Sequence, residues 1–228
     1  MTRIIQGVLE FQKRVFGGKR ALYEQLGKGQ KPLALFITCS DSRITPSGLT
    51  QTEPGELFIL RNAGNLVPPH GAGPWAEAAT IEYAVVQLRV RDIILCGHSK
   101  CGAMHGLLEP QALQRLPSVA GWLAHAQEVL PRVQAAGALS PEEQLDRAIK
   151  ENVLVQLEHL KSHPAVRDAL AVRTLRLHGW VYHFEKGLVE SYDPLSGKFV
   201  PLEQQVRQKW LNHAEEDKAP RTVWDTHI

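Results

Sequence analysis

A short apolar segment that ends in metal-binding residue types constrains this chain more than any other feature. The run Ile93-Ile-Leu-Cys96 has no polar alternation, which is typical of a strand buried on both faces. Gly97 ends the run, and His98 and Cys101 follow three residues apart. This spacing lets an imidazole and a thiol lie side by side on one turn and share an ion. The segment predicts an α/β fold with a metal site at a strand end.

Two ligands do not complete a zinc site, so a third must come from elsewhere in the chain. Cys96 lies inside the predicted strand and is interpreted as a buried apolar residue. Cys39 follows another apolar run, 33–38, in the position that His98 occupies after its own strand. Because ligands bind beyond the carboxyl ends of parallel strands, Cys39 is expected to meet His98 and Cys101 there. The alternative, core thiols and surface imidazoles without a metal, stays open at this point.

Composition bounds the class of protein. The chain has 228 residues, a net charge of +2 and an odd number of cysteines, three. We expect one domain over 1–228, with a helical arm at 1–26 and a polar tail at 203–228, in which Trp210 and Trp224 are isolated anchors. No basic block suggests a nucleic-acid partner, and no apolar run reaches membrane-spanning length. The odd cysteine count and the lack of a signal-peptide core at the start predict a cytoplasmic protein, free or inside a cytoplasmic microcompartment.

Hydrophobic periodicity predicts the order of helices and strands. Strands are expected at 33–38, 56–61, 92–97, 175–182 and 188–192, the last two joined as a hairpin by the turn 185–187. Helices are expected at 1–26 (interrupted at Gly17-Gly18), 74–89, 102–108, 119–130, 140–162 and 165–171. The arm has an apolar stripe at Ile4, Val8, Phe11 and Val15. This stripe could pack on its own domain or on a partner subunit.

An acidic and a basic residue follow the first predicted strand. Asp41 and Arg43 flank one residue, so in an extended segment their side chains would point to the same side. A carboxylate held by a guanidinium stays ionised and oriented. Beside zinc it could accept a hydrogen bond from bound water or bind the metal itself. An isolated Asp-x-Arg pair, by contrast, is usually a surface ion pair.

Three motifs together resemble the β-class carbonic anhydrases: Cys39-Ser-Asp-Ser-Arg43, Glu53-Pro-Gly-Glu-Leu-Phe58 leading into Arg61-Asn62, and His98-Ser-Lys-Cys101-Gly. The resemblance runs from the N-terminal helices to about residue 200, and also includes Gln30-x-Pro32 and Leu177-His-Gly-Trp-Val-Tyr182. It implies a mostly parallel central sheet flanked by helices, with a C-terminal antiparallel edge strand. It also implies reversible hydration of carbon dioxide to bicarbonate and a proton, through attack by zinc-bound hydroxide.

The resemblance also assigns residues. One Zn²⁺ per subunit would be held by Cys39, His98 and Cys101, with Asp41 and Arg43 as a catalytic dyad. The catalytic unit in the family is a homodimer with clefts at the subunit interface, and dimers often pair into tetramers. The N-terminal helices embrace the neighbouring subunit, which favours the partner as the place for the apolar stripe. The substrate cleft would be lined by Gln30, Phe58, Ala63, Ile44, Tyr83 and Gly102.

One departure from the family is visible. Some members hold a non-catalytic bicarbonate ion with a Trp, an Arg and a Tyr; here Arg61 and Tyr182 match, but Phe36 stands in place of the Trp. We therefore expect no bicarbonate-locked state, and an Asp41 paired with Arg43 rather than bound to zinc.

Three alternatives remain on the sequence alone. The same scaffold hosts hydrolases of carbonyl sulfide and carbon disulfide, which the motifs do not separate from carbonic anhydrases. A non-catalytic, zinc-stabilised scaffold protein is a second alternative, although the intact Asp41 and Arg43 argue against it. A thiol redox protein is a third, and the lack of a Cys-x-x-Cys motif argues against that.

Overall fold

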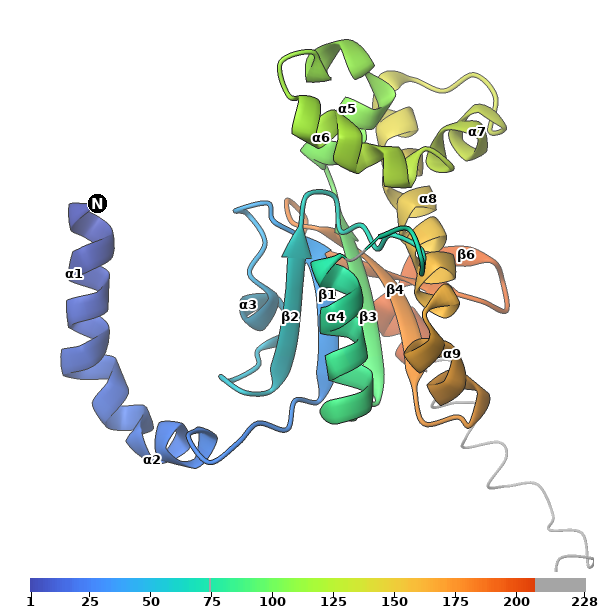
Figure 1. Ribbon diagram of the computed structural model, residues 1–228. Helices are drawn as coiled ribbons and strands as arrows, with labels where there is room; N and C mark the ends of the chain where they lie inside the picture. The colour runs from blue at the N-terminus through green and yellow to red at the C-terminus, as the bar shows by residue number, and fades with distance from the viewer. Residues whose placement is uncertain (74, 208–228) are drawn as a thin grey trace, which may run out of the picture.

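The computed structural model describes residues 1–73 and 75–207. Within this part of the chain, six strands form one sheet in the order β2-β1-β3-β4-β5-β6 (Figure 1). The strands are β1 (Ala34–Cys39), β2 (Leu57–Asn62), β3 (Asp92–His98), β4 (Arg176–His183), β5 (Leu188–Asp193) and β6 (Lys198–Pro201). Strands β2, β1, β3 and β4 pair in parallel, and β5 and β6 extend the sheet with antiparallel pairing. This is the α/β fold that the resemblance implied.

The two central parallel strands are the ones predicted from unbroken apolar runs. All six residues of β1 are buried, and β3 is buried from Leu95 to its end at His98. Because β1 and β3 are neighbours with Ile37 opposite Leu95, their carboxyl ends lie side by side. This adjacency brings the segment after Cys39 next to the segment after His98.

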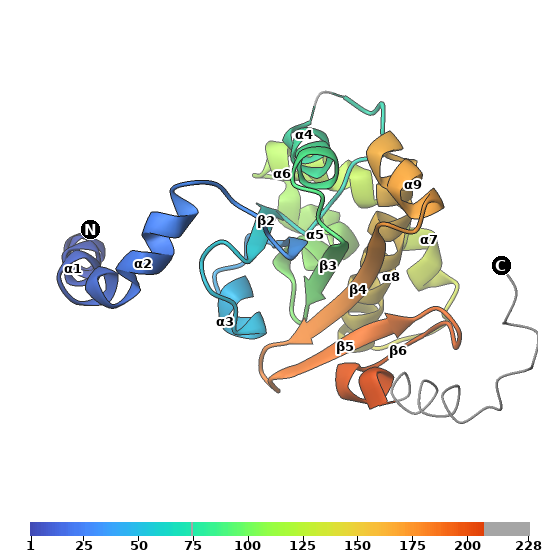
Figure 2. The same cartoon turned by 90° about the horizontal axis from the view of Figure 1, so that it is seen from below.

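Helix α4 (Ala76–Glu82) and the two helices over 141–171 cover one face of the sheet, and the helices between residues 102 and 134 lie beyond the carboxyl ends of the parallel strands (Figures 1 and 2). The longest is α8 (Pro141–Ser162), which begins with the predicted capping box: the Glu143 amide donates to Ser140 Oγ, and the Ser140 amide donates to the Glu143 carboxylate. The other helices over 102–171 are α5 (Gly102–Leu108), α6 (Pro117–Leu123), α7 (Val129–Gln134) and α9 (Pro164–Ala171), with single turns η3 (Pro110–Leu113) and η4 (Ala124–Ala126).

Helix α8 packs directly on the backbone of β3 and β4 through two glycines. A Cβ at Gly97 would lie 3.0 Å from Val153 Cγ2, and one at Gly179 would lie 2.8 Å from Leu157 Cδ1. Such distances leave no room for a methyl group, so the glycines permit the close approach. Val153 is fully buried in this contact.

Several sequence-based boundaries were wrong. The helix predicted at 119–130 is divided into α6, η4 and α7, because Pro131 lies in the first turn of α7 and cannot continue a preceding helix. The antiparallel edge of the sheet is β6, which was not predicted, and a short helix α3 (Pro46–Thr50) was also missed. The predicted helix at 74–89 ends in a π-helical turn, η2 (Tyr83–Gln87).

The N-terminal arm consists of α1 (Thr2–Glu10), a π-helical turn η1 (Phe11–Val15) and α2 (Phe16–Leu26). The predicted break at Gly17-Gly18 does not occur, since both glycines lie within α2 and the irregular turn comes before them. No residue of the arm is buried, and Ile4 and Val8 are 67% and 52% exposed. The arm extends away from the sheet in both views (Figures 1 and 2). Residues 1–73 and 75–207 of one chain thus leave the apolar stripe of the arm uncovered.

No helix in the described ranges combines the length and apolar character needed to cross a membrane. The polar tail continues as a helical segment at 202–207. Trp210 and Trp224, the anchors suggested from the sequence, lie outside the described residues.

Candidate metal centre

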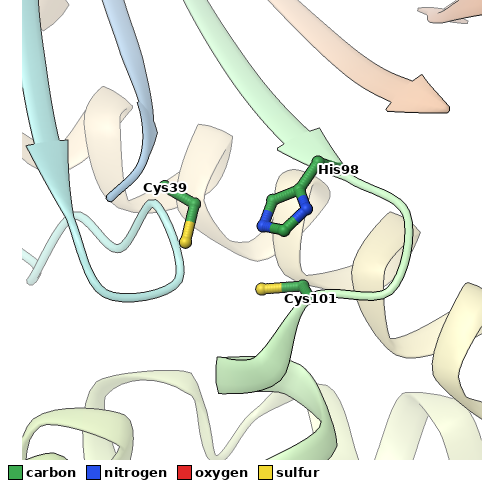
Figure 3. A group of neighbouring side chains, drawn as sticks. All are labelled: Cys39, His98 and Cys101. Atoms are coloured by element: carbon green, nitrogen blue, oxygen red, sulfur yellow. The ribbon is translucent and has the colours of Figure 1, made fainter. Parts of the chain in front are cut away.

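Three ligand-type side chains converge beyond the carboxyl ends of β1 and β3. Cys39 is the last residue of β1, His98 is the last residue of β3, and Cys101 directly precedes α5 (Figure 3). All three are buried, and their two sulfur atoms and one imidazole nitrogen lie within 4.8 Å of one another. The three candidate ligands predicted from the sequence are therefore together in space, at the predicted end of the sheet.

The link between His98 and Cys101 differs from a helical turn. Lys100 has a left-handed backbone conformation (φ +52°), which reverses the chain between the strand and α5. The Ser99 amide donates to the Tyr182 carbonyl (2.9 Å), and the Ser99 hydroxyl donates to the Glu185 carboxylate. His98 and Cys101 are therefore connected by a tight loop and not by a helical turn. The β4–β5 hairpin supports this loop through Tyr182 and Glu185.

The two ring nitrogens of His98 have different surroundings: Nδ1 is hydrogen-bonded to the backbone, and Nε2 faces the two sulfurs. Nδ1 lies 2.8 Å from the Ser99 carbonyl, to which it donates, so the neutral ring carries its lone pair on Nε2. Nε2 is buried and has no hydrogen-bond partner among the described residues. A buried nitrogen lone pair without a donor is costly, and a metal ion would satisfy it. Two sulfurs and one imidazole nitrogen suit Zn²⁺, so the residues fit this ion.

The two thiols are strongly coupled. Hydrogen bonding from the neighbouring Cys101 side chain lowers the pKa of Cys39 to about 4. The neighbouring Cys39 thiolate, together with burial, raises the pKa of Cys101. Cys96, by contrast, is fully buried, and burial raises its pKa to about 12, as expected for a core residue.

Asp41 and Arg43 form a two-bond ion pair beside the cluster. Arg43 Nε donates to Asp41 Oδ1 (2.9 Å), and Nη2 donates to Oδ2 (2.7 Å). The segment is a turn and not extended as predicted, because the Arg43 amide also donates to Asp41 Oδ1 (2.9 Å). These bonds hold the pKa of Asp41 well below its usual range. Asp41 Oδ2 lies 3.9 Å from His98 Nε2, so an ionised carboxylate borders the metal position.

Arg43 is itself fixed on two further sides. Its guanidinium donates to the Lys100 carbonyl (3.1 Å) and lies over the Phe184 ring at 4.4 Å from the centroid. Such contacts orient a planar guanidinium better than they would a lysine ammonium.

Arg61 matches the Arg of the bicarbonate site that some family members have, but here it binds backbone oxygens. Its guanidinium donates to the Cys39 carbonyl (3.0 and 2.8 Å) and to the Asp41 carbonyl (2.7 Å). Phe36, in the position of the missing Trp, is fully buried and packs edge-on against Trp180. In this arrangement Arg61 supports the turn that presents Asp41.

The remaining predicted pocket residues fall into two groups. Ala63, Ile44 and Gly102 lie on segments that touch the cluster: Ala63 precedes Gly64, whose amide donates to Cys39 Sγ (3.4 Å), and Gly102 follows Cys101. The Ile44 amide donates to the Asp41 carbonyl (3.1 Å), while its side chain is 1% exposed.

Gln30, Phe58 and Tyr83 lie near the opposite ends of the strands. Gln30 precedes β1, and Phe58 is opposite Leu35, four positions before the residue opposite Cys39. At ~3.3 Å per residue, this places Phe58 roughly 13 Å from the metal cluster along the strand. The Tyr83 ring is tilted by 33° relative to the Phe58 ring, with centroids 6.0 Å apart, and Tyr83 is 47% exposed. The chain does not bring this group to its own metal cluster.

Some supporting residues were not found from the sequence. Asn62 closes the loop after β2, accepting from the Leu66 amide and donating to the Leu66 carbonyl (2.8 Å each). The Gly64 amide and the Ser99–Glu185 bond also act on ligand segments. No periodicity or spacing signals these contacts, because each depends on how separate loops meet.

Comparison with known proteins agrees with this geometry. A family model described as Carbonic anhydrase matches residues 34–189. A carbonic anhydrase of Pseudomonas aeruginosa is 46% identical over 202 residues, which span 89% of this chain and 92% of the relative. One from Synechocystis is 44% identical over 208 residues, spanning 90% of this chain and 76% of the relative.

Solved structures give the same result. The structure of the β-carbonic anhydrase CcaA superposes with a TM-score of 0.86 at 45% identity, covering 88% of this chain and 91% of that one. A structure from work on two tetrameric β-carbonic anhydrases of Sordaria macrospora has a TM-score of 0.74 at 29% identity, covering 83% and 95%. The chain therefore belongs to the β-class carbonic anhydrases, zinc enzymes that hydrate carbon dioxide reversibly.

Proposed function

We propose that Cys39, His98 and Cys101 bind the catalytic zinc ion of this carbonic anhydrase. The observation that supports this most directly is the buried Nε2 of His98, which has no hydrogen-bond partner within 1–73 and 75–207 and lies within 4.8 Å of the two sulfurs. Three protein ligands are the pattern of a catalytic site, which keeps one position open. A zinc ion held there would supply a Lewis-acidic position that lowers the pKa of a water molecule.

Asp41 would orient that water and not store its proton. Because Arg43 keeps the pKa of Asp41 well below its usual range, the carboxylate is an acceptor throughout the neutral range. Its Oδ2 borders the metal position and has lone-pair capacity beyond the bond to Arg43. Accepting a hydrogen bond from the water would aim the oxygen's remaining lone pair at the carbon of CO2. The released proton would then have to pass to another group or to buffer.

A second copy of the chain would complete the substrate cleft. By strand spacing, Phe58 lies roughly 13 Å from the cluster of its own chain. Gln30 precedes β1, and the Tyr83 ring lies 6.0 Å from the Phe58 ring. Tyr83 and the neighbouring Val86 are 47% and 60% exposed, and no residue of the arm is buried. We therefore propose a homodimer in which these three residues of each copy face the other copy's metal, and in which the arm covers its apolar stripe. Pairing of such dimers into a tetramer is proposed from the Sordaria macrospora relatives.

A reducing, cytoplasmic location is proposed as well, either free or within a microcompartment. All three cysteines are unpaired, and two of them are needed as thiolates. A reducing compartment keeps thiols available for metal binding.

Zinc stoichiometry combined with stopped-flow CO2 hydration tests the proposed centre. We expect about one zinc per subunit and CO2 hydration that exceeds carbonyl sulfide hydrolysis measured on the same preparation. The variant Cys101→Ser should lose both the metal and the activity. Wild-type turnover in that variant, or a preference for carbonyl sulfide, would contradict the proposal.

A further inference from the structure

A single peptide unit, Ala63–Gly64, lies between an indole and the sulfur of Cys39. Trp122 Nε1 donates to the Ala63 carbonyl (2.8 Å), and the Gly64 amide donates to Cys39 Sγ (3.4 Å). The carbonyl and N–H of a trans peptide point in opposite directions, and no described peptide bond is cis. Fixing the oxygen with Trp122 therefore directs the hydrogen at the sulfur.

The following peptide unit is held from the other side by helix α8. Asn152 Nδ2 donates to the Gly64 carbonyl (2.9 Å), and Asn152 is 1% exposed. Its own Oδ1 accepts from Gln156 Nε2 (3.1 Å), while Gln156 Oε1 accepts from the Val67 amide (2.8 Å). A buried polar network with its hydrogen bonds made is rigid, so Gly64 is fixed on both flanks.

Gly64 itself suits this position for two reasons. Its φ of +82° is in the region that favours glycine, and a Cβ there would lie 3.0 Å from the Ala103 Cβ. The loop can thus approach both the sulfur and α5 closely.

We propose that Trp122 and Asn152 are positioning residues for the zinc centre, acting through the Gly64 amide on the Cys39 thiolate. This inference rests on the proposed zinc site. Donation to a thiolate withdraws electron density from sulfur and fixes the direction of its lone pairs. A peptide whose carbonyl accepts a hydrogen bond is also a stronger N–H donor, so the Trp122 bond reinforces the bond to sulfur.

The test uses the full-length protein, Trp122→Phe and Asn152→Ser, each loaded with Zn²⁺ or with Co²⁺. Zinc affinity is measured by competition with a chromophoric chelator, and the sulfur-to-cobalt charge-transfer band by absorption. We expect about a tenfold loss of zinc affinity in each variant, within the usual effect of outer contacts on metal sites. The charge-transfer band should move to lower energy, because sulfur that loses a donor is easier to oxidise.

Trp75→Phe is the matched control. Trp75 lies next to Trp122, with ring centroids 6.0 Å apart, but its indole nitrogen has no hydrogen-bond partner within the described residues. We expect its zinc affinity and cobalt spectrum to match the wild type, which separates loss of the hydrogen bond from loss of an indole ring.

The outcomes distinguish this inference from the proposed function. Wild-type protein that binds no zinc would overturn the metal centre itself. Wild-type protein that binds zinc, with Trp122→Phe and Asn152→Ser equal to it in affinity and spectrum, would overturn the inference alone. If one variant fails to fold, as judged by circular dichroism, the other decides the matter. If Trp122→Phe alters zinc affinity and the cobalt spectrum while Asn152→Ser alters neither, Asn152 is not a positioning residue for the zinc centre.

Discussion

Replacing Gly179 with alanine should destabilise the protein by driving α8 away from the sheet. A Cβ at this position of β4 would lie 2.8 Å from Leu157 Cδ1 and 2.9 Å from Val153 Cγ1. Carbon atoms in contact are normally ~3.5–4.0 Å apart, so at least about 0.7 Å of displacement is needed at Leu157. Val153 is fully buried and Leu157 is 8% exposed, which leaves these side chains little freedom to move.

The expected cost is that of overpacking a core, about 1–3 kcal/mol in the free energy of unfolding. For a chain of this size, each kcal/mol lowers the melting temperature by about 2–4 °C, so the total fall should be about 2–12 °C. A second effect should follow, because Asn152 adjoins Val153 on α8 and holds the Gly64 carbonyl. Zinc affinity should therefore fall together with stability.

The assay is urea unfolding followed by far-ultraviolet circular dichroism, at matched protein and zinc concentrations, since assembly and ligand both shift the transition. Gly121→Ala is the control, because Gly121 lies in α6 and has no atom within 4 Å of an added Cβ. It should be neutral or should stabilise by up to about 1 kcal/mol. An unfolding free energy of Gly179→Ala equal to or above the wild type would refute the reasoning.

Three other predictions concern the site and the arm. Asp41→Asn should lower kcat/KM by about 10²–10⁴-fold with zinc content unchanged, since it removes an oriented acceptor and no ligand; near-normal kcat/KM would count against the role of Asp41. Arg43 lowers the pKa of Asp41 in the folded state. The stabilisation from this pair is therefore fully present above the unfolded-state pKa of about 3.9, and it is lost as the pH falls through the lower pKa of the folded state. The pH–rate profile should thus show no Asp41 inflection between about pH 5 and pH 8. In Arg43→Gln the inflection should move upward toward the ordinary value of about 3.9, so the profile is followed below pH 5; an inflection that does not move there argues against the pairing. Deleting residues 1–26 should give monomers in sedimentation velocity that keep zinc but hydrate CO2 poorly, and a fully active dimer from that deletion would contradict the proposed exchange.

The cluster of candidate metal ligands could be predicted from the sequence because its signal is local. Each of Cys39 and His98 directly follows an apolar run long enough to define a strand, and the order of strands in a parallel sheet brings such ends together. The Asp41–Arg43 pair was visible for the same reason, although the turn that forms it was not. The capping box of α8 is also a short-range pattern.

What the sequence did not reveal depends on contacts between distant segments. The bond from Trp122 to Ala63 joins α6 to the loop after β2, and neither segment has a motif that predicts the other. β6 has only four residues and extends an edge, so its pairing with β5 leaves little periodicity to detect. The assignment of Gln30, Phe58 and Tyr83 to a shared cleft came from the family resemblance and could not have come from spacing within one chain.

The position of the ligands on two separate strands has a consequence for how the protein acquires its ion during folding. His98 and Cys101 are close in sequence, but Cys39 joins them only after β1 has paired with β3, a contact between remote parts of the chain. Non-local strand pairing is a slow step in folding. A nascent chain should hold zinc only weakly until that pairing is made, so the rate of metal uptake during refolding would report directly on the formation of the sheet's centre.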